Sequence, residues 1–237
     1  MYRAKGVKLN DMKTEIFEFN GYQATVIFPQ KPNGKWIWKT EFLYAYDESE
    51  RALLDRGYTR VYYSISDKYG SNKAVRLMHA FHRFLIKKYP LQEKPCLFGF
   101  SRGGLYAFNY ALYYPELVDK IYLDAPVLDV KTWPLPKSIE QAQLFEEYCL
   151  AENTFEKFAN SPVDNFKEFF ESERKLLVVA GGADKLVPYE QNAGRLVKYC
   201  QENGIKIDFY FKPDCGHHPH SLQDVTPIVE FIERADD

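Results

Sequence analysis

Ser101 lies at the centre of the segment GFSRG, residues 99–103, which has the spacing G-x-S-x-G. The apolar run at residues 95–98 is typical of a buried strand, and the apolar spacing of residues 105–112 is typical of a packed helix. We therefore expect Ser101 on a tight strand-to-helix turn, where flanking glycines avoid collisions. Such a turn exposes the hydroxyl beside the free N–H groups of a helix N-terminus, which can stabilise an oxyanion. The segment predicts a nucleophilic serine.

A serine hydroxyl is a weak nucleophile at neutral pH and needs a base, which a carboxylate in turn orients. Asp184 follows the apolar run at 175–180, and His217 follows the strand pattern at 205–211. In a doubly wound sheet, ligands bind outside the carboxyl ends of the strands, so we expect Ser101, Asp184 and His217 to meet there. Their order along the chain is that of hydrolases with a nucleophile elbow.

Both partners of the serine have competitors nearby in the sequence. His218 and His220 follow His217, which is preferred as the base because it comes directly after a glycine at a strand end. Asp124 ends the preceding strand pattern and could also reach a histidine. Asp184 is preferred because it lies after a glycine-rich strand end and before the dipeptide Val-Pro.

Metal binding is the alternative use of these histidines, since imidazole is a common ligand. Adjacent histidines rarely point at one ion, and no convincing carboxylate or thiolate cluster accompanies them, so no metal site is predicted. Cys215 is interpreted as a packed thiol. His79 and His82 are spaced i,i+3 on a predicted helix and are interpreted as part of an ordinary helix face.

Strand and helix patterns alternate along most of the chain. A hairpin is expected at 14–29 around Asn20-Gly21, followed by strands at 35–39 and 59–66 and helices at 48–56 and 73–88. Further strands are expected at 120–126, 175–180 and 205–211, and helices at 189–203 and 224–234. This spacing predicts crossover connections and a parallel sheet in one α/β domain spanning 1–237. Residues from about 130 to 172 break the rhythm and predict a small lid-like insertion.

Composition excludes several classes of protein. The formal net charge is -2 and the sequence pI is about 6.2, so no nucleic-acid or anionic-membrane partner is expected. The four cysteines are widely spaced and predict no disulfide framework. No apolar run approaches the length of a transmembrane helix, and the N-terminus shows no apolar signal core. We expect a cytoplasmic protein, or a periplasmic or secreted one if a signal peptide was removed. Its oligomeric state is left open.

Three segments, GFSRGG at 99–104, GGADKLVP at 181–188 and CGHHPH at 215–220, together resemble the α/β-hydrolase superfamily in its serine esterase branch. The resemblance implies an eight-stranded, mostly parallel sheet with an antiparallel edge formed by the first two strands. It also implies an oxyanion hole with one donor at the backbone N–H of Arg102 and a second near Trp38, where many relatives carry His-Gly instead. Similar segments occur in bacterial hydrolases that we associate with carbohydrate-ester cleavage.

The expected function is that of a carboxylesterase acting on a small or carbohydrate-linked acyl ester, through an acyl-enzyme on Ser101. Trp36, Phe100 and Trp133 are candidates to line the substrate pocket, although aromatic residues are core by default. Neither a metal nor an organic cofactor is expected. The alternatives are a peptidase or acyltransferase that uses the same residues, and a non-catalytic binding protein on the same fold.

Overall fold

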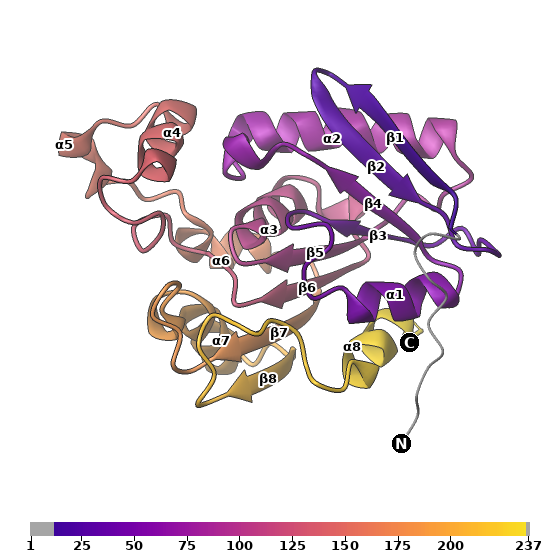
Figure 1. Cartoon of the computed structure of the whole chain (residues 1–237). Helices are drawn as coiled ribbons and strands as arrows, with labels where there is room; N and C mark the ends of the chain where they lie inside the picture. The colour runs from indigo at the N-terminus through magenta and orange to yellow at the C-terminus, as the bar shows by residue number, and fades with distance from the viewer. Residues whose placement is uncertain (1–11, 236–237) are drawn as a thin grey trace.

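The computed structural model describes residues 12–235, so the two ends of the predicted domain, including the N-terminal segment considered for a signal, lie outside the described residues. Within the described range, one eight-stranded sheet has the order β1-β2-β4-β3-β5-β6-β7-β8 (Figure 1). The strands are β1 Thr14–Phe19, β2 Tyr22–Ile27, β3 Trp36–Lys39, β4 Thr59–Tyr63, β5 Cys96–Phe100, β6 Lys120–Asp124, β7 Lys175–Gly181 and β8 Asp208–Lys212.

Strands β1 and β2 form the predicted hairpin, and β2 also pairs antiparallel with β4. Asn20 and Gly21 both have positive φ, 49° and 81°, as the two central residues of a hairpin turn of this twist require. All other neighbouring strands are parallel. The predicted α/β-hydrolase fold, with its antiparallel edge, is therefore confirmed.

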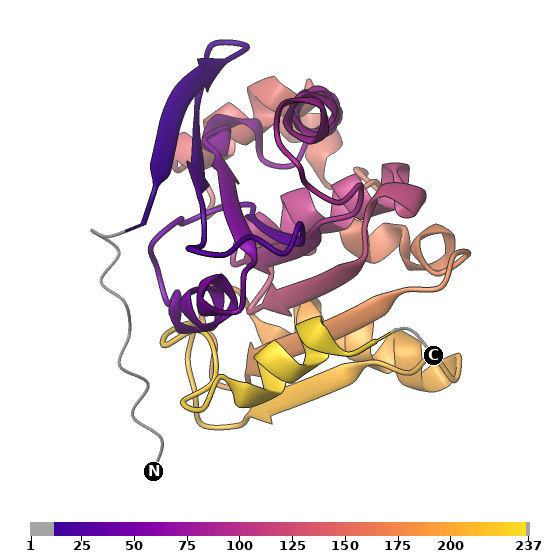
Figure 2. The ribbon, with the colours of Figure 1, turned by 90° about the vertical axis from the view of Figure 1, so that its right-hand side faces the viewer.

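Helices cover both faces of the sheet (Figures 1 and 2). Helices α2, α3 and α7 pack on one face, and α1 and α8 pack on the other and contact each other. Side chains alternate between these two cores along each buried strand: in β5, Leu97 faces the first core, whereas Cys96 and Phe98 face the second. The helices are α1 Glu48–Asp55, α2 Asn72–Lys88, α3 Gly103–Tyr113, α4 Ile139–Tyr148, α5 Glu152–Phe155, α6 Phe166–Phe169, α7 Ala193–Glu202 and α8 Thr226–Glu233.

The predicted helix at 189–203 is interrupted near its start. A 3-10 turn, Tyr189–Gln191, precedes α7, and Asn192 between them has φ -123° and ψ -100°. The Asn192 side chain accepts hydrogen bonds from the backbone N–H groups of Leu128 and Asp129 at 2.8 and 3.0 Å. A long-range contact thus outweighs the local helix pattern, and it ties the start of α7 to the segment after β6. No helix of residues 12–235 is both long and apolar enough to cross a membrane.

The predicted insertion lies between β6 and β7 and contains α4, α5, the 3-10 helix Pro162–Asp164 and α6. Helices α4 and α5 project from the sheet at the side where the parallel strands end (Figure 1). Helix α4 is anchored on the loop after β4: Tyr69 Oη donates to Gln143 at 2.6 Å, and Tyr148 Oη donates to the Tyr69 carbonyl at 2.8 Å. Phe169 of α6 stacks on Phe108 of α3, with ring centroids 4.0 Å apart. The insertion is therefore fixed to the body at two places.

Buried charges lie beneath the end of β3. Lys39 is fully buried, and its Nζ contacts Glu50 at 2.5 Å and lies 3.3 Å from the centroid of the Phe100 ring. Burial lowers the pKa of Lys39, and the Glu50 carboxylate partly offsets that effect. The guanidinium of Arg60 is 2.9 Å from Asp47 and 3.7 Å from Glu50. These paired charges support the strand that leads into the loop facing Ser101.

Replacing Lys39 with Met should destabilise the fold by about 3–5 kcal/mol, because Glu50 loses its closest cation while it stays buried. Urea denaturation followed by circular dichroism measures this change. The exposed Lys31→Met is the matched control and should shift stability by less than about 0.5 kcal/mol. Equal effects of the two substitutions would show that the buried pair does not support β3.

Candidate active site

Ser101 follows β5 and has a φ of 50°, a left-handed conformation that is uncommon outside glycine. Hydrogen bonds hold its backbone there: its N–H donates to the Asp124 carbonyl at 2.9 Å, and its carbonyl accepts from Val127 N–H at 2.8 Å. The neighbouring glycines are needed for space, since a Cβ at Gly99 would lie 2.8 Å from Ala107 and one at Gly104 would lie 2.6 Å from Pro126. The expected strand-to-helix turn is present.

The structure brings Ser101, His217 and Asp184 together in one hydrogen-bonded chain. His217 Nε2 lies 2.9 Å from Ser101 Oγ, and His217 Nδ1 lies 2.7 Å from Asp184 Oδ2. The three residues follow β5, β8 and β7, and each is at most 9% exposed. Because the carboxylate accepts from Nδ1–H, the Nε2 atom carries the lone pair that can accept the serine proton.

Asp184 is held in its ionised form. Burial raises the pKa of this carboxyl, but the hydrogen bonds from His217 and from the backbone N–H groups of Val187 and Leu186 outweigh burial and leave the pKa below its usual value. The two backbone donors both reach Oδ1, at 2.8 and 2.9 Å, so that Oδ2 is left for the imidazole. The segment after β7 thus holds one carboxylate oxygen while the other bonds to His217.

Two of the three competitors, Asp124 and His220, pair with each other instead. His220 Nδ1 lies 2.7 Å from Asp124 Oδ1, and Asp124 Oδ2 accepts from Tyr122 Oη at 2.6 Å and from Ser221 N–H at 2.7 Å. The side chain of His218 is exposed overall. Its partial burial and the neighbouring imidazoles of His220 and His217 lower its pKa. The sequence did not predict this second histidine–aspartate pair.

The two predicted oxyanion donors have different positions. The N–H of Arg102 precedes the first turn of α3, where amides have no acceptor within the helix. Trp38 does not fit the role, because it lies within β3, whose backbone pairs with β4 on one side and with β5 on the other. The N–H of Thr40 is used as well, donating to the Phe98 carbonyl at 3.0 Å. The amides that follow in the same loop are those of Glu41 and Phe42.

Glu41 connects this loop to the turn at Ser101, a contact that the sequence did not predict. Its Oε2 accepts from Ser66 Oγ at 2.9 Å and from Arg102 Nε at 3.2 Å, while its Oε1 has no partner among the described residues. Burial raises the pKa of Glu41, and Arg102 partly counteracts it. A polar Thr-Glu dipeptide directly after an apolar strand was the signal that could have indicated it.

Two of the three predicted pocket residues lie elsewhere. Trp36 is 1% exposed in the core and donates from Nε1 to the Gln92 carbonyl at 2.8 Å. Phe100 is fully buried on the opposite face of the sheet, between Lys39 and His220. Both expectations are therefore corrected, because strand alternation turns these rings into the two cores. Trp133 is half-buried at the start of the insertion, with its ring 6.1 Å from that of Tyr69.

A polar cavity of about 520 Å³ lies behind the insertion, where it meets the N-terminal end of α2 and the exposed side of α3. Its lining includes Lys73, Arg76, Asn109 and Glu147, and none of Ser101, Asp184 and His217. This cavity therefore does not contain Ser101, Asp184 or His217. The hydrogen-bonded chain at the strand ends is the better guide to the reactive site, because it joins three groups whose chemistry is complementary.

The fold and the strand-end position of Ser101 are those of an α/β-hydrolase. Residues 55–235, more than half of the chain, match the model of the prolyl oligopeptidase family (Peptidase_S9). The chain belongs to this family of serine hydrolases. A comparison with curated proteins gave no match.

Solved structures share the fold at low sequence identity. An acylaminoacyl peptidase from Pyrococcus horikoshii is 15% identical with a TM-score of 0.66, and the match covers 89% of this chain and 38% of that one. A puromycin-hydrolyzing peptidase from Mycobacterium tuberculosis is 13% identical with a TM-score of 0.68, covering 94% of this chain and 38% of that one. The chain thus spans about two fifths of the length of each of these proteins, and the likeness concerns the fold.

Replacing Gly181 with Ala should lower kcat/KM by about 100-fold, the cost of moving a reacting group by about 1 Å. The new methyl group would overlap the carbonyl oxygens of Cys215 and Gly216 and displace the segment that carries His217. Gly216→Ala is the matched control in the same segment, since its Cβ would meet nothing closer than the Ala183 oxygen at 3.9 Å. Steady-state kinetics of the two folded variants test this, and equal rates would contradict it.

Asp184 should also make stability depend on acid pH. Its folded-state pKa lies below the unfolded value near 3.8, so its contribution is fully present above about pH 5 and is lost as the pH falls through the folded pKa. The difference in unfolding free energy between wild type and Asp184→Asn should therefore shrink between pH 5 and the folded pKa of Asp184. Urea denaturation at several pH values measures it, and a constant difference would show that the carboxylate is not stabilised in the folded state.

Proposed function

We propose that Ser101 is the nucleophile of this serine hydrolase, with His217 as general base and Asp184 as the carboxylate that orients it. The observation that carries the proposal is the continuous chain of hydrogen bonds from Ser101 Oγ through the imidazole to Asp184. Ser101 Oγ bonds to the substrate carbonyl carbon while His217 Nε2 takes the hydroxyl proton. The same proton passes to the leaving group, and water then cleaves the acyl-enzyme with His217 again as base.

The negative charge that develops on the substrate carbonyl oxygen during attack needs hydrogen-bond donors, which we place at the start of α3. We assign one to the backbone N–H of Arg102 and the other to the amides of the loop at Glu41 and Phe42. A Cβ at Gly103 would lie 3.5 Å from Glu41 N and 3.1 Å from Glu41 Cβ, so this loop passes directly against the first residue of α3. The ion pair between Arg102 and Glu41 supports the arrangement, because it joins the two segments that carry the donors.

For the substrate, we propose a short peptide or a related small amide. Membership of the prolyl oligopeptidase family supports amide cleavage, and the two structural neighbours are both described as peptidases. The second candidate is the carboxylesterase activity expected from the sequence, on small or carbohydrate-linked esters. The same hydrogen bond between Ser101 and His217 supports it, since a serine activated by a base attacks an ester carbonyl, which is less stabilised by resonance than an amide, by the same steps.

A small substrate agrees with the position of the insertion. Helix α4 is held to the loop after β4, and Trp133 lies against Tyr69 of that loop. We propose that Trp133 lines the substrate pocket beneath this cover. The exposed apolar side chains of this region, Leu135 at 55% and Ile139 at 76%, are too few to form the extended apolar face of an interface-activated lid.

A fluorophosphonate probe should label the wild-type protein and leave Ser101→Ala unlabelled, because only a serine activated by a base reacts with it. Labelling is read by mass spectrometry of the Ser101 peptide. In steady-state kinetics, Asp184→Asn should slow turnover by about 10⁴-fold, because the imidazole of His217 is no longer held in its orientation. His218→Ala is the control and should label like wild type, since its ring makes no hydrogen bond with residues 12–235.

A matched panel then separates the two substrate classes. An aminoacyl anilide, a short dipeptide amide and the corresponding ester of the same acyl group would be compared by kcat/KM. Turnover of the amides supports the peptidase proposal, and turnover of the esters alone supports the carboxylesterase. Absence of labelling in folded wild-type protein would overturn the assignment of Ser101.

A further inference from the structure

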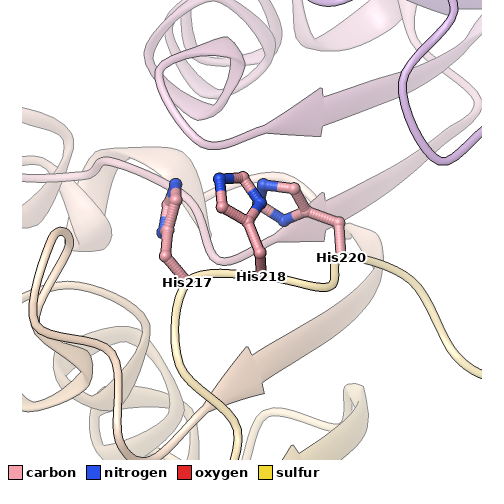
Figure 3. Close-up of side chains that lie close together, drawn as sticks. All are labelled: His217, His218 and His220. Atoms are coloured by element: carbon pink, nitrogen blue, oxygen red, sulfur yellow. The ribbon is translucent and has the colours of Figure 1, made fainter.

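Three imidazoles lie together on the segment that follows β8 (Figure 3). One ligand nitrogen from each of His217, His218 and His220 lies within 4.8 Å of the other two. The ring centroids are 4.9 to 5.0 Å apart in every pair, and each pair is close to perpendicular. The residues are close in sequence, and one of the three rings, that of His217, lies next to Ser101 with Nε2 2.9 Å from Oγ.

Two of these rings have their tautomer set by a carboxylate. His217 donates from Nδ1 to Asp184, and His220 donates from Nδ1 to Asp124, in both cases at 2.7 Å. In each neutral ring the remaining nitrogen, Nε2, therefore carries a lone pair. Carboxylate–histidine pairs of this kind commonly support metal ions, because they orient the imidazole and make it a stronger ligand.

His218 supplies a third nitrogen that is available to a ligand. Its side chain is exposed, and its ring packs against Tyr46, with centroids 5.8 Å apart, without a hydrogen bond to the described residues. Three neutral imidazoles with a fourth open position are a typical zinc-binding set. Zinc ligands at about 2.1 Å in a tetrahedron are about 3.4 Å apart, a spacing that rotation of the exposed His218 ring helps to reach.

We propose that His217, His218 and His220 form an inhibitory zinc site. This proposal goes beyond the hydrolase activity, and only its inhibitory arm rests on the assigned role of His217. The lone pair on His217 Nε2 serves one partner at a time: it accepts the Ser101 hydroxyl proton or it binds the metal. Zinc binding thus removes the base without breaking a covalent bond, and a chelator restores it.

Direct metal binding tests the site without reference to turnover. Isothermal titration with Zn²⁺, and the visible absorption of Co²⁺ as a spectroscopic substitute, should show one ion per wild-type chain. His218→Ala should weaken binding by about tenfold or more, a loss typical of residues that support a metal site. His79→Ala is the matched control, since His79 stacks on Tyr114 outside the cluster and should leave binding unchanged.

Competition between zinc and the fluorophosphonate probe tests whether zinc binding inhibits the reaction of Ser101. Zinc should slow labelling of Ser101 in wild type and in His79→Ala, a chelator should reverse the effect, and His218→Ala should need about tenfold more zinc. If Ser101 is not labelled at all, the assigned nucleophile fails while the titration still decides the metal site. Three results would overturn the proposal: no binding at micromolar Zn²⁺, equal affinity of wild type and His218→Ala, or binding that leaves labelling unchanged.

Discussion

The active edge of this protein depends on one strained residue. Ser101 has a φ of 50°, which for a residue with a side chain costs about 1–3 kcal/mol and persists only when its surroundings enforce it. Hydrogen bonds from Ser101 to Asp124 and from Val127 to Ser101 enforce it here, and glycines at 99 and 104 allow α3 and the segment after β6 to approach. Relaxation of that turn would move the hydroxyl away from His217, so packing of the whole sheet edge supports the position of a single oxygen atom.

Asp124 at the end of β6 links this turn to the second histidine pair. Its carbonyl accepts the N–H of Ser101, and its carboxylate holds His220. Asp184 one strand further holds His217 in the same way. Neighbouring parallel strands therefore each end in a carboxylate that orients an imidazole, although only one of the two imidazoles reaches the serine. The second pair fixes the orientation of His220 within the cluster of three histidines.

Charge is distributed around the site so that most buried ions have partners. Lys39 and Glu50 lie beneath the loop after β3, and the ion pair of Glu41 and Arg102 lies next to Ser101 in the chain. Removing one member of such a pair is costly because the other stays desolvated. The loop lies against Gly103, the first residue of α3, through Thr40 and Glu41. The loop after β3 is thus held in place by charges on both of its sides.

The sequence by itself determined the alternation of strands and helices, the hairpin at Asn20-Gly21, and the strand–turn–helix at Ser101, because these depend on local periodicity and on glycines that permit unusual backbone angles. The sequence also indicated that Ser101, Asp184 and His217, which follow three different strands, meet at one edge of the sheet. Only the tertiary structure decided that Asp124 pairs with His220, and that Trp36 and Trp38 face a core. Those outcomes depend on strand order and on the face to which each side chain points, which are properties of long-range packing that spacing along the chain does not encode.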